Sequence, residues 1–289
     1  QCISRFLLPG AVCSENLQTS WSGSMRYYKQ VPTRFGEMCL FLDDPSIGKS
    51  LDLYGEYCYP EIELILNMVN SDSIVLDVGA NIGSHCLALA PYVNNIVAFE
   101  ADKENADLLE INCGLQSADN ISVKHLALGN RVGLTGTKFD FGKTCLSTVT
   151  DPDVEITTLD TWMTLHELML LPKVDFIKID VEGMELAVLK GGKSLITTVK
   201  PSMLIEMQDE LKNPAVYDFL IEAGYKIWWY PVATFNADNY NNNQFDVFGR
   251  QHGVINWFAS QHSHPITQEL MPVVDRFDTI ERAEHTRRN

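Results

Sequence analysis

Acidic residues stand at the ends of the short apolar runs of this chain, where β-strands are expected to end. Asp77 and Glu100 end the first two such runs, Asp180 and Glu182 follow another, and Glu206 ends the last. Ligands of open α/β sheets bind beyond the carboxyl ends of the strands, so we expect these carboxylates to gather at one rim. Carboxylates there can hold ribose hydroxyls, favour a cationic ligand, or take a proton from a hydroxyl nucleophile.

The segment after Asp77 predicts a strand, a tight turn and a helix. Gly79, Asn81 and Gly83 follow at alternate positions, and an apolar stretch begins at Leu87. Glycine lets the backbone pass close to a ligand and reach positive φ without a clash. The pattern differs from the dinucleotide fingerprint G-x-G-x-x-G, because Asn81 replaces the second glycine and Gly83 comes one residue too early. It also lacks the Gly-Lys-Ser/Thr of a phosphate loop. From the glycines between a strand and a helix, we expect this turn to contact a nucleoside.

Glu100 supports a nucleoside ligand. It lies 21 residues after Gly79, at the tip of the second predicted strand, where a carboxylate can accept hydrogen bonds from both ribose hydroxyls. The same arrangement serves NAD, so this residue alone does not identify the cofactor. Glu100 could instead cap the helix that begins near Asp102.

The segment 174–185 carries the other acidic group. Lys178 and Asp180 share a face of the predicted strand, and Glu182 lies just past its end. A structural ion pair would also explain Lys178 and Asp180, because an ionisable residue in an apolar strand is costly unless it is paired or useful. We predict that Asp180, Glu182 and Glu206 are catalytic, although Glu206 could instead cap the next helix. His85 is a less favoured alternative base, and three acids do not establish a metal site, so no metal is predicted.

Strands and helices alternate along most of the chain. Strands are expected at 73–78, 95–99, 121–126, 174–180 and 201–206, and helices at 83–90, 103–116, 184–191 and 213–223. A hairpin over 25–42 and helices over 46–54 and 60–69 precede them, residues 131–158 read as irregular loop with short strands, and a hairpin formed by 226–232 and 253–259 follows. This order predicts a doubly wound, mostly parallel α/β sheet with an antiparallel last strand. The expected organisation is an N-terminal extension and lid (1–70), a ligand-binding core (71–260) and a polar C-terminal tail (261–289).

Composition limits the possible partners and location. The 289 residues are 45% hydrophobic and carry a formal charge of −16, which disfavours nucleic acid as a substrate. Seven cysteines without a C-x-x-C pair indicate neither a disulfide framework nor a zinc site, so a reduced, cytoplasmic protein is expected. The N-terminus is a poor signal peptide, no apolar run approaches the roughly 20 residues of a membrane span, and nothing indicates an oligomeric state.

The motifs together resemble a known family. The string Phe176–Gly192 closely resembles the signature of FkbM-family methyltransferases, which depend on S-adenosylmethionine (SAM). Further pieces fit the same family over residues 46 to about 258: 77–83, 98–102, 127–130, 158–160 and 204–206. The resemblance implies the Rossmann-like class I methyltransferase fold, SAM as cofactor with S-adenosylhomocysteine (SAH) as product, and methylation of a hydroxyl on a sugar, a glycan or a related small molecule.

The expected cofactor-binding residues follow from the motifs and this resemblance. They are Asp77, Gly79, Asn81, Gly83, Glu100, Ala127, Leu128 and Asp180. Glu56, between the two N-terminal helices, is expected to meet the ammonium group of SAM, with a solvated acid at a helix end as the alternative.

Two other functions remain as alternatives. A nicotinamide-dependent oxidoreductase has the same type of fold, but the fingerprint glycine and an evident Tyr-x-x-x-Lys pair are missing. A SAM-binding module without catalysis is disfavoured by Asp180 and Glu182. The C-terminal aromatic residues could form an acceptor wall, although core packing is the commoner role; they are Trp228, Trp229, Tyr230, Phe235, Tyr240 and Trp257. We expect His262 and His264 to be surface residues.

Overall fold

An eight-stranded sheet forms the centre of the molecule in the computed structural model, which describes residues 17–21, 24–140, 143–147, 154–165, 174–207, 213–249 and 253–281. Its strand order is β15-β13-β14-β12-β11-β4-β5-β6. Five neighbouring strands are parallel: β12 (Ser202–Glu206), β11 (Phe176–Ile179), β4 (Ile74–Val78), β5 (Asn95–Glu100) and β6 (Ile121–His125). Their carboxyl ends therefore lie at one edge.

The C-terminal hairpin continues the sheet in the antiparallel sense. Strand β14 (Gly253–Ser260) pairs with β12, and β13 (Lys226–Ala233) pairs with β14. The short β15 (Met271–Pro272) adds to the outer side of β13. The predicted α/β fold with an antiparallel last strand is thus confirmed.

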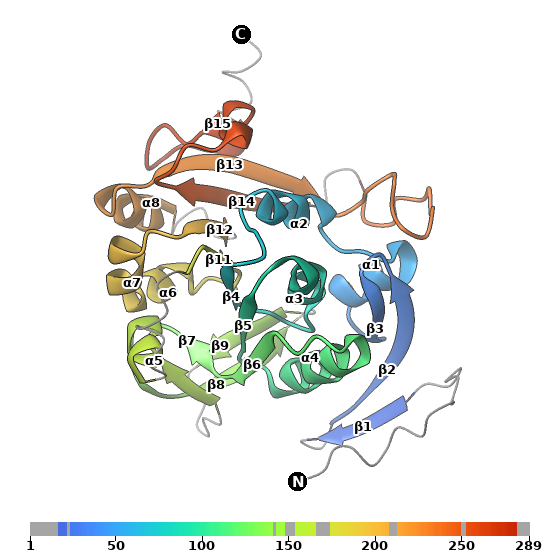
Figure 1. The fold of residues 1–289 in the computed structure, drawn as a ribbon. Coiled ribbons are helices and arrows are strands. Elements are labelled where there is room, and N and C mark those ends of the chain that lie inside the picture. Colours follow the sequence, from blue (N-terminus) through green and yellow to red (C-terminus); the bar gives the residue numbers. More distant parts are fainter. Residues whose placement is uncertain are drawn as a thin grey trace.

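Helices cover both faces of the sheet (Figure 1). One face packs against α2 (Tyr59–Leu66), α3 (Ser84–Leu89) and α4 (Lys103–Gln116), with η1 (Ala90–Tyr92) beside them. The other packs against α5 (Leu159–Leu165), α6 (Glu185–Gly191), α7 (Lys193–Thr198) and α8 (Asn213–Glu222). Successive strand residues alternate between these layers: Val75 belongs to the first core and Leu76 to the second. Burial on both faces explains why the strands read as continuous apolar runs.

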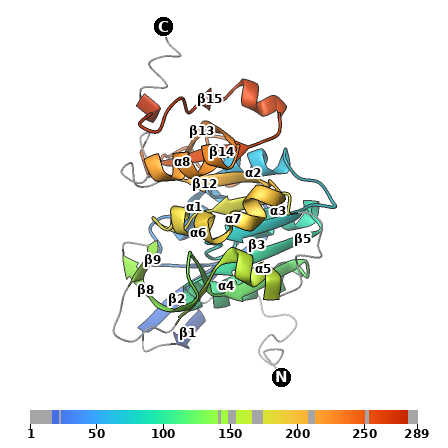
Figure 2. The ribbon, with the colours of Figure 1, turned by 90° about the vertical axis from the view of Figure 1, so that its left-hand side faces the viewer.

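A second, N-terminal sheet packs outside α3 and α4 (Figures 1 and 2). It comprises β1 (Leu17–Trp21), β2 (Ser24–Thr33) and β3 (Gly36–Phe41), and α1 (Ile47–Tyr54) follows it. The buried amide of Asn112 on α4 joins this sheet to the glycine turn, because it bonds both the Cys39 backbone and the Ile82 carbonyl. The extension therefore shares a core with the main domain.

The structure differs from the predicted elements in three places. Residues 131–158 contribute to a four-stranded sheet of β7 (Ala127–Leu128), β10 (Val154–Thr157), β8 (Gly133–Asp140) and β9 (Lys143–Ser147) rather than mainly irregular loop. Helices α5 and α7 were not predicted because each is only two turns long, too short for clear periodicity. Within the expected tail, the described residues 261–281 include two elements that were not predicted, η3 (Pro265–Gln268) and β15, and the indole of Trp229 donates to Asp278. None of the described helices is long and apolar enough to cross a membrane.

Candidate active site

A cavity of about 210 Å³ opens at the carboxyl edge of the parallel strands. Its walls come from the ends of β4, β5, β11 and β12, from β7, and from the start of α1. Eight of the predicted site residues line it: Gly79, Asn81, Glu100, Ala127, Leu128, Asp180, Glu182 and Glu206. The chain folds so that acids more than a hundred residues apart share one space.

The glycine turn is shaped by close backbone contact. Gly79 has φ +87°, and a Cβ there would lie 1.8 Å from the carbonyl oxygen of Asp180. Asn81 also has positive φ (50°), and its side chain accepts from the Ile82 amide at 2.8 Å. Gly83, the residue before α3, would place a Cβ 2.2 Å from Leu109 and does not line the cavity. Gly79 thus fits the turn to the end of β11, whereas Gly83 fits it to α4.

Glu100 is held in place from both sides. Its Oε2 accepts from the Asn81 amide and its Oε1 from the Asp102 amide, each at 2.7 Å. Burial, opposed by these two hydrogen bonds, raises the pKa of Glu100 to about 7. Asp102, rather than Glu100, caps α4, because its side chain accepts from Asn105 at 3.0 Å. Glu100 is therefore a buried carboxyl that faces the cavity with a fixed orientation.

Asp77 lies beneath the cavity rather than in its wall. It is buried, accepts a hydrogen bond from the Cys86 thiol at 3.0 Å, and its other oxygen lies 3.8 Å from the Lys178 ammonium. That ammonium donates to Asp180 at 3.1 Å. Burial would lower the pKa of Lys178, but Asp180 and Asp77 raise it, so Lys178 is a buried cation between two carboxylates. The ion pair that the sequence left as an alternative therefore exists, and Asp180 also faces the cavity.

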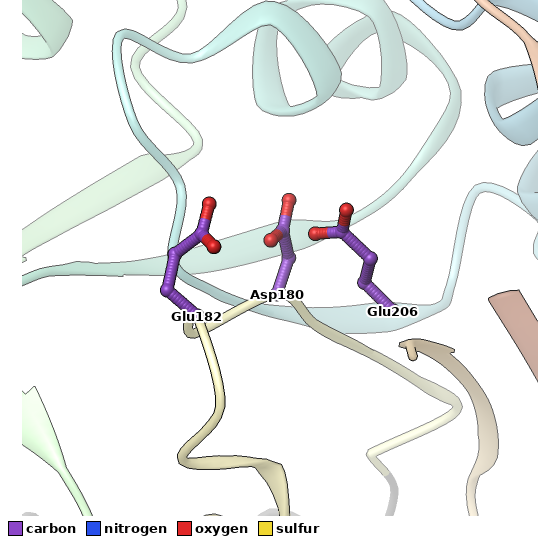
Figure 3. A group of neighbouring side chains, drawn as sticks. All are labelled: Asp180, Glu182 and Glu206. Atoms are coloured by element: carbon purple, nitrogen blue, oxygen red, sulfur yellow. The ribbon is translucent and has the colours of Figure 1, made fainter. Parts of the chain in front are cut away.

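Asp180, Glu182 and Glu206 come together as predicted from the strand ends (Figure 3). One carboxylate oxygen of each lies within 4.8 Å of the others. Glu182 reaches this position because it adopts φ 51° and the next residue, Gly183, φ 91°, so the chain turns sharply after β11. Burial alone would raise the pKa of Asp180, but the charge of the Lys178 ammonium and the hydrogen bond that it donates hold this pKa below its usual range. Among the described residues, this is a grouping that could hold a divalent cation; the absence of a metal stays a prediction.

Sequence reasoning missed three residues that line the cavity: Tyr57, Ser84 and Thr234. His85, the alternative base, lines it too. His85 Nε2 lies 3.0 Å from Oε2 of the buried Glu61, a residue that the sequence did not single out. The signal was weak, because a single acid in an amphipathic helix usually faces solvent.

Glu56 has a different setting from the one expected. It does not line the cavity, and it is buried with its carboxylate bound by the Arg34 guanidinium, the Asn236 amide at 2.7 Å and the Tyr240 backbone N–H at 3.1 Å. It joins the N-terminal sheet to the loop between β13 and β14. This geometry does not test the expected contact of Glu56 with the ammonium group of SAM.

The aromatic residues divide between core and loop. Trp229 and Trp257 are buried in the main core, and Trp228 packs against the Phe258 ring. None of the six lines the cavity, so the described structure does not place an aromatic acceptor wall there. His264 bonds Ser260 at 3.2 Å, while His262 is exposed.

Comparison with known proteins identifies the family. The sequence model of the methyltransferase FkbM domain matches residues 77–227, more than half of the chain. This chain belongs to the FkbM methyltransferase family. The match includes the glycine turn, Glu100 and the three clustered acids. The protein is therefore a methyltransferase, and its family implies SAM as the methyl donor. The oxidoreductase alternative is excluded.

The individual proteins that match this chain have low sequence identity to it. The chain is 28% identical over 187 residues to the hexuronic acid methyltransferase AglP of Haloferax volcanii, covering 61% of this chain and 72% of AglP. The crystal structure of an FkbM methyltransferase from Methylobacillus flagellatus matches with 19% identity and a TM-score of 0.43, over 65% of this chain but only 43% of that one. A Streptococcus mutans protein solved in complex with SAH matches with 8% identity and a TM-score of 0.41, over 70% and 96% of the two chains.

Proposed function

We propose that this FkbM-family protein transfers a methyl group from SAM to a hydroxyl of a sugar, a glycan or a related small molecule. The observation that carries the proposal is that one cavity holds both Glu100, beside the glycine turn, and the acidic group of Asp180, Glu182 and Glu206. The likeness to AglP, named for its action on a hexuronic acid, supports a glycan acceptor.

The residues around the glycine turn fit SAM. Each oxygen of Glu100 accepts one backbone N–H, which leaves a lone pair on each for a ribose hydroxyl. Ala127 and Leu128 offer an apolar wall for the adenine. The missing side chain of Gly79 leaves backbone at the cavity surface, and Asp180 beside it can favour the positive sulfonium.

In this methyl transfer the protein forms no covalent bond with the donor or the acceptor. Its task is to hold the two in the correct orientation. When bound, SAM would supply a methyl group on a sulfonium; the acceptor oxygen would attack the methyl carbon in line with the departing sulfur. The reacting atoms must be held about 3–3.5 Å apart and collinear. Asp180, Glu182 and Glu206 can accept hydrogen bonds from the acceptor's hydroxyls and fix its pose, and their negative charge favours the cationic donor. Loss of the hydroxyl proton completes the transfer.

The protein's location and partners are part of the same proposal. Cys58, Cys86 and Cys113 are free thiols among the described cysteines, which supports a reduced, cytoplasmic compartment. The acidic charge supports a small or glycan acceptor rather than nucleic acid.

Calorimetry and a transfer assay test the proposal. SAM and SAH should bind, whereas NAD and NADP should not. Labelled SAM should then methylate members of a panel of methyl hexosides, methyl hexuronosides and longer glycans, and mass spectrometry should locate the label on an oxygen. Binding of NAD without SAM, or label on carbon or nitrogen, would overturn the proposal.

A further inference from the structure

A buried hydrogen-bonded chain leads away from the cavity through His85. His85 Nε2 lies 3.0 Å from Glu61 Oε2, and the other oxygen of Glu61 accepts from the Asn256 side-chain amide at 2.9 Å. All three residues are at least 95% buried, and they come from α3, α2 and β14. Of the three, only His85 lines the cavity.

With Glu61 ionised, this chain of bonds sets which ring nitrogen carries the proton. The Asn256 amide donates to one oxygen of Glu61, and an ionised Glu61 accepts from His85 at the other. Nε2 of His85 must then carry a hydrogen, which leaves Nδ1 as the basic nitrogen of the neutral ring. Ser84 Oγ lies 3.4 Å from this Nδ1, and Ser84 also lines the cavity.

We propose that His85 takes the proton of the acceptor hydroxyl on Nδ1, and that Glu61, held by Asn256, is the positioning residue that sets its tautomer. The oxygen–hydrogen bond breaks as the oxygen bonds the methyl carbon, and the carbon–sulfur pair stays on sulfur, which becomes the neutral thioether of SAH. The proton ends on His85 as an imidazolium beside Glu61. This inference rests on the proposed methyl transfer.

The surrounding charges favour His85 over Asp180 for this step. Asp180 is paired with the Lys178 ammonium, so it is a weak base at neutral pH. Imidazole has an unperturbed pKa near neutrality, which suits proton transfer at ordinary pH. The ionisable groups near the His85 site are Glu61 on α2, Tyr57 and Cys58 before it, Lys178 on β11, and Asp180 and Glu206 at the strand ends. Asp180, Glu182 and Glu206 then orient the acceptor while His85 removes its proton.

Nitrogen-15 NMR of the SAH-bound protein tests the tautomer without an acceptor. We expect the hydrogen of neutral His85 on Nε2, and loss of this preference in Glu61→Ala. His262→Gln, a change at an exposed histidine, is the control for assignment and folding. A hydrogen on Nδ1 in the wild type would overturn the proposal.

Kinetics test the role in catalysis, on the acceptor from the hexoside and hexuronoside panel that the wild type methylates. His85→Gln should lower kcat about 10²–10⁴-fold with unchanged SAH affinity. Glu61→Gln should lower kcat and move its acid limb to lower pH, because the imidazolium loses its anionic partner. His85→Gln turnover within a few-fold of wild type would overturn the proposal. A wild type that binds SAH with the expected tautomer but methylates no acceptor would instead count against the proposed function.

Discussion

At the scale of single residues, the proton of Glu100 would link folding to the proposed binding of SAM. Burial raises its pKa from 4.5 to about 7, so the folded ligand-free protein holds a proton that the unfolded chain releases between these values. This contribution to stability is complete below about pH 4.5 and is lost as the pH rises through about 7. Binding has the opposite sign, because ribose hydroxyls donate best to the ionised carboxylate.

We therefore expect SAH affinity to rise with pH up to about 7 and then to level off. The rise should approach tenfold per pH unit below that point. Glu100→Gln, which cannot ionise, should bind SAH more weakly, by about 1–3 kcal/mol, and without this pH dependence. Calorimetry across the range measures both effects. A Glu100→Gln protein that keeps wild-type affinity and slope would place the ribose elsewhere.

Asp180 should matter for turnover more than for cofactor binding. Asp180→Asn keeps size and hydrogen bonding but removes the charge that faces both the cavity and Lys178. We expect SAM affinity to stay within a few-fold, while kcat falls by at least about 10²-fold, as for loss of a preorganised charge in the transition state. Equal losses in SAM affinity and in kcat/KM would show that Asp180 only binds the cofactor.

At the scale of elements, the glycine turn and the end of β11 depend on each other. The Gly79 backbone packs against the carbonyl of Asp180 so closely that no side chain fits between the strands' ends. One contact therefore sets both the path of the glycine turn and the position of Asp180.

Substitution of glycine by alanine should have opposite effects at two places. Gly79→Ala puts a Cβ 1.8 Å from a backbone oxygen at φ +87°, so we expect a large loss of stability and of SAH binding. Gly114→Ala in α4 meets nothing within 4 Å and should stabilise by about 0.5–1 kcal/mol. Thermal unfolding and SAH titration of the matched pair check this. A Gly79→Ala protein that is as stable as Gly114→Ala would mean that the turn adjusts freely.

The buried carboxylate of Glu56 connects the segment after α1 with the turn after β2 and the loop after β13. It binds Arg34 after β2, and Asn236 and Tyr240 in the loop after β13. Tyr54 at the end of α1 holds the same loop, since its hydroxyl donates to the Phe245 carbonyl at 2.9 Å. The loop lies between β13 and β14, whose facing ends contribute Thr234 and Gly253 to the cavity.

We expect Glu56→Gln to loosen this loop rather than to remove a cofactor ligand. The loop between β13 and β14 should become more sensitive to proteolysis and exchange its amides faster, because an amide cannot replace the ion pair with Arg34. SAH affinity should change little. Asp52→Asn, at an exposed ion pair with Lys29, is a control for loss of surface charge. Weaker SAH binding with an unchanged loop would instead support Glu56 as the partner of the SAM ammonium.

At the scale of the whole molecule, negative charge is concentrated where the chemistry is expected. The chain carries a formal charge of −16, and Glu100, Asp180, Glu182 and Glu206 all line one cavity. Lys178 also lines the cavity, and its ammonium group is paired with Asp180. This negative field favours the cationic SAM. A hexuronate carboxylate would be repelled by it, and would enter the cavity only if a positive charge offset that repulsion.

Chelation tests whether such compensation comes from a metal. We expect turnover on neutral hexosides to survive dialysis against EDTA, because orientation by carboxylates needs no cation. The measurement is the methyl-transfer rate before and after chelation, and again with added Mg²⁺, for paired hexoside and hexuronoside acceptors. Loss of hexoside turnover that Mg²⁺ restores would show that Asp180, Glu182 and Glu206 hold a metal.

The sequence by itself determined the main sheet, the glycine turn and the acidic rim. These are local signals: apolar runs of strand length, alternate glycines, and acids at strand ends that parallel pairing brings to one edge. The helix over 103–116 was predicted to the residue because Asp102 supplies a clear N-cap. The family signature lies in the same segments.

Only the tertiary structure decided what surrounds those segments. The pairing of Glu61 with His85, and the capture of Glu56 by Arg34, join residues from separate elements, and no spacing in the sequence encodes them. Asp77 could not be placed beneath the cavity from sequence, because its neighbours Cys86 and Lys178 come from α3 and β11. Side-chain partners depend on how layers pack in three dimensions, whereas strand ends and turns depend on a few consecutive residues.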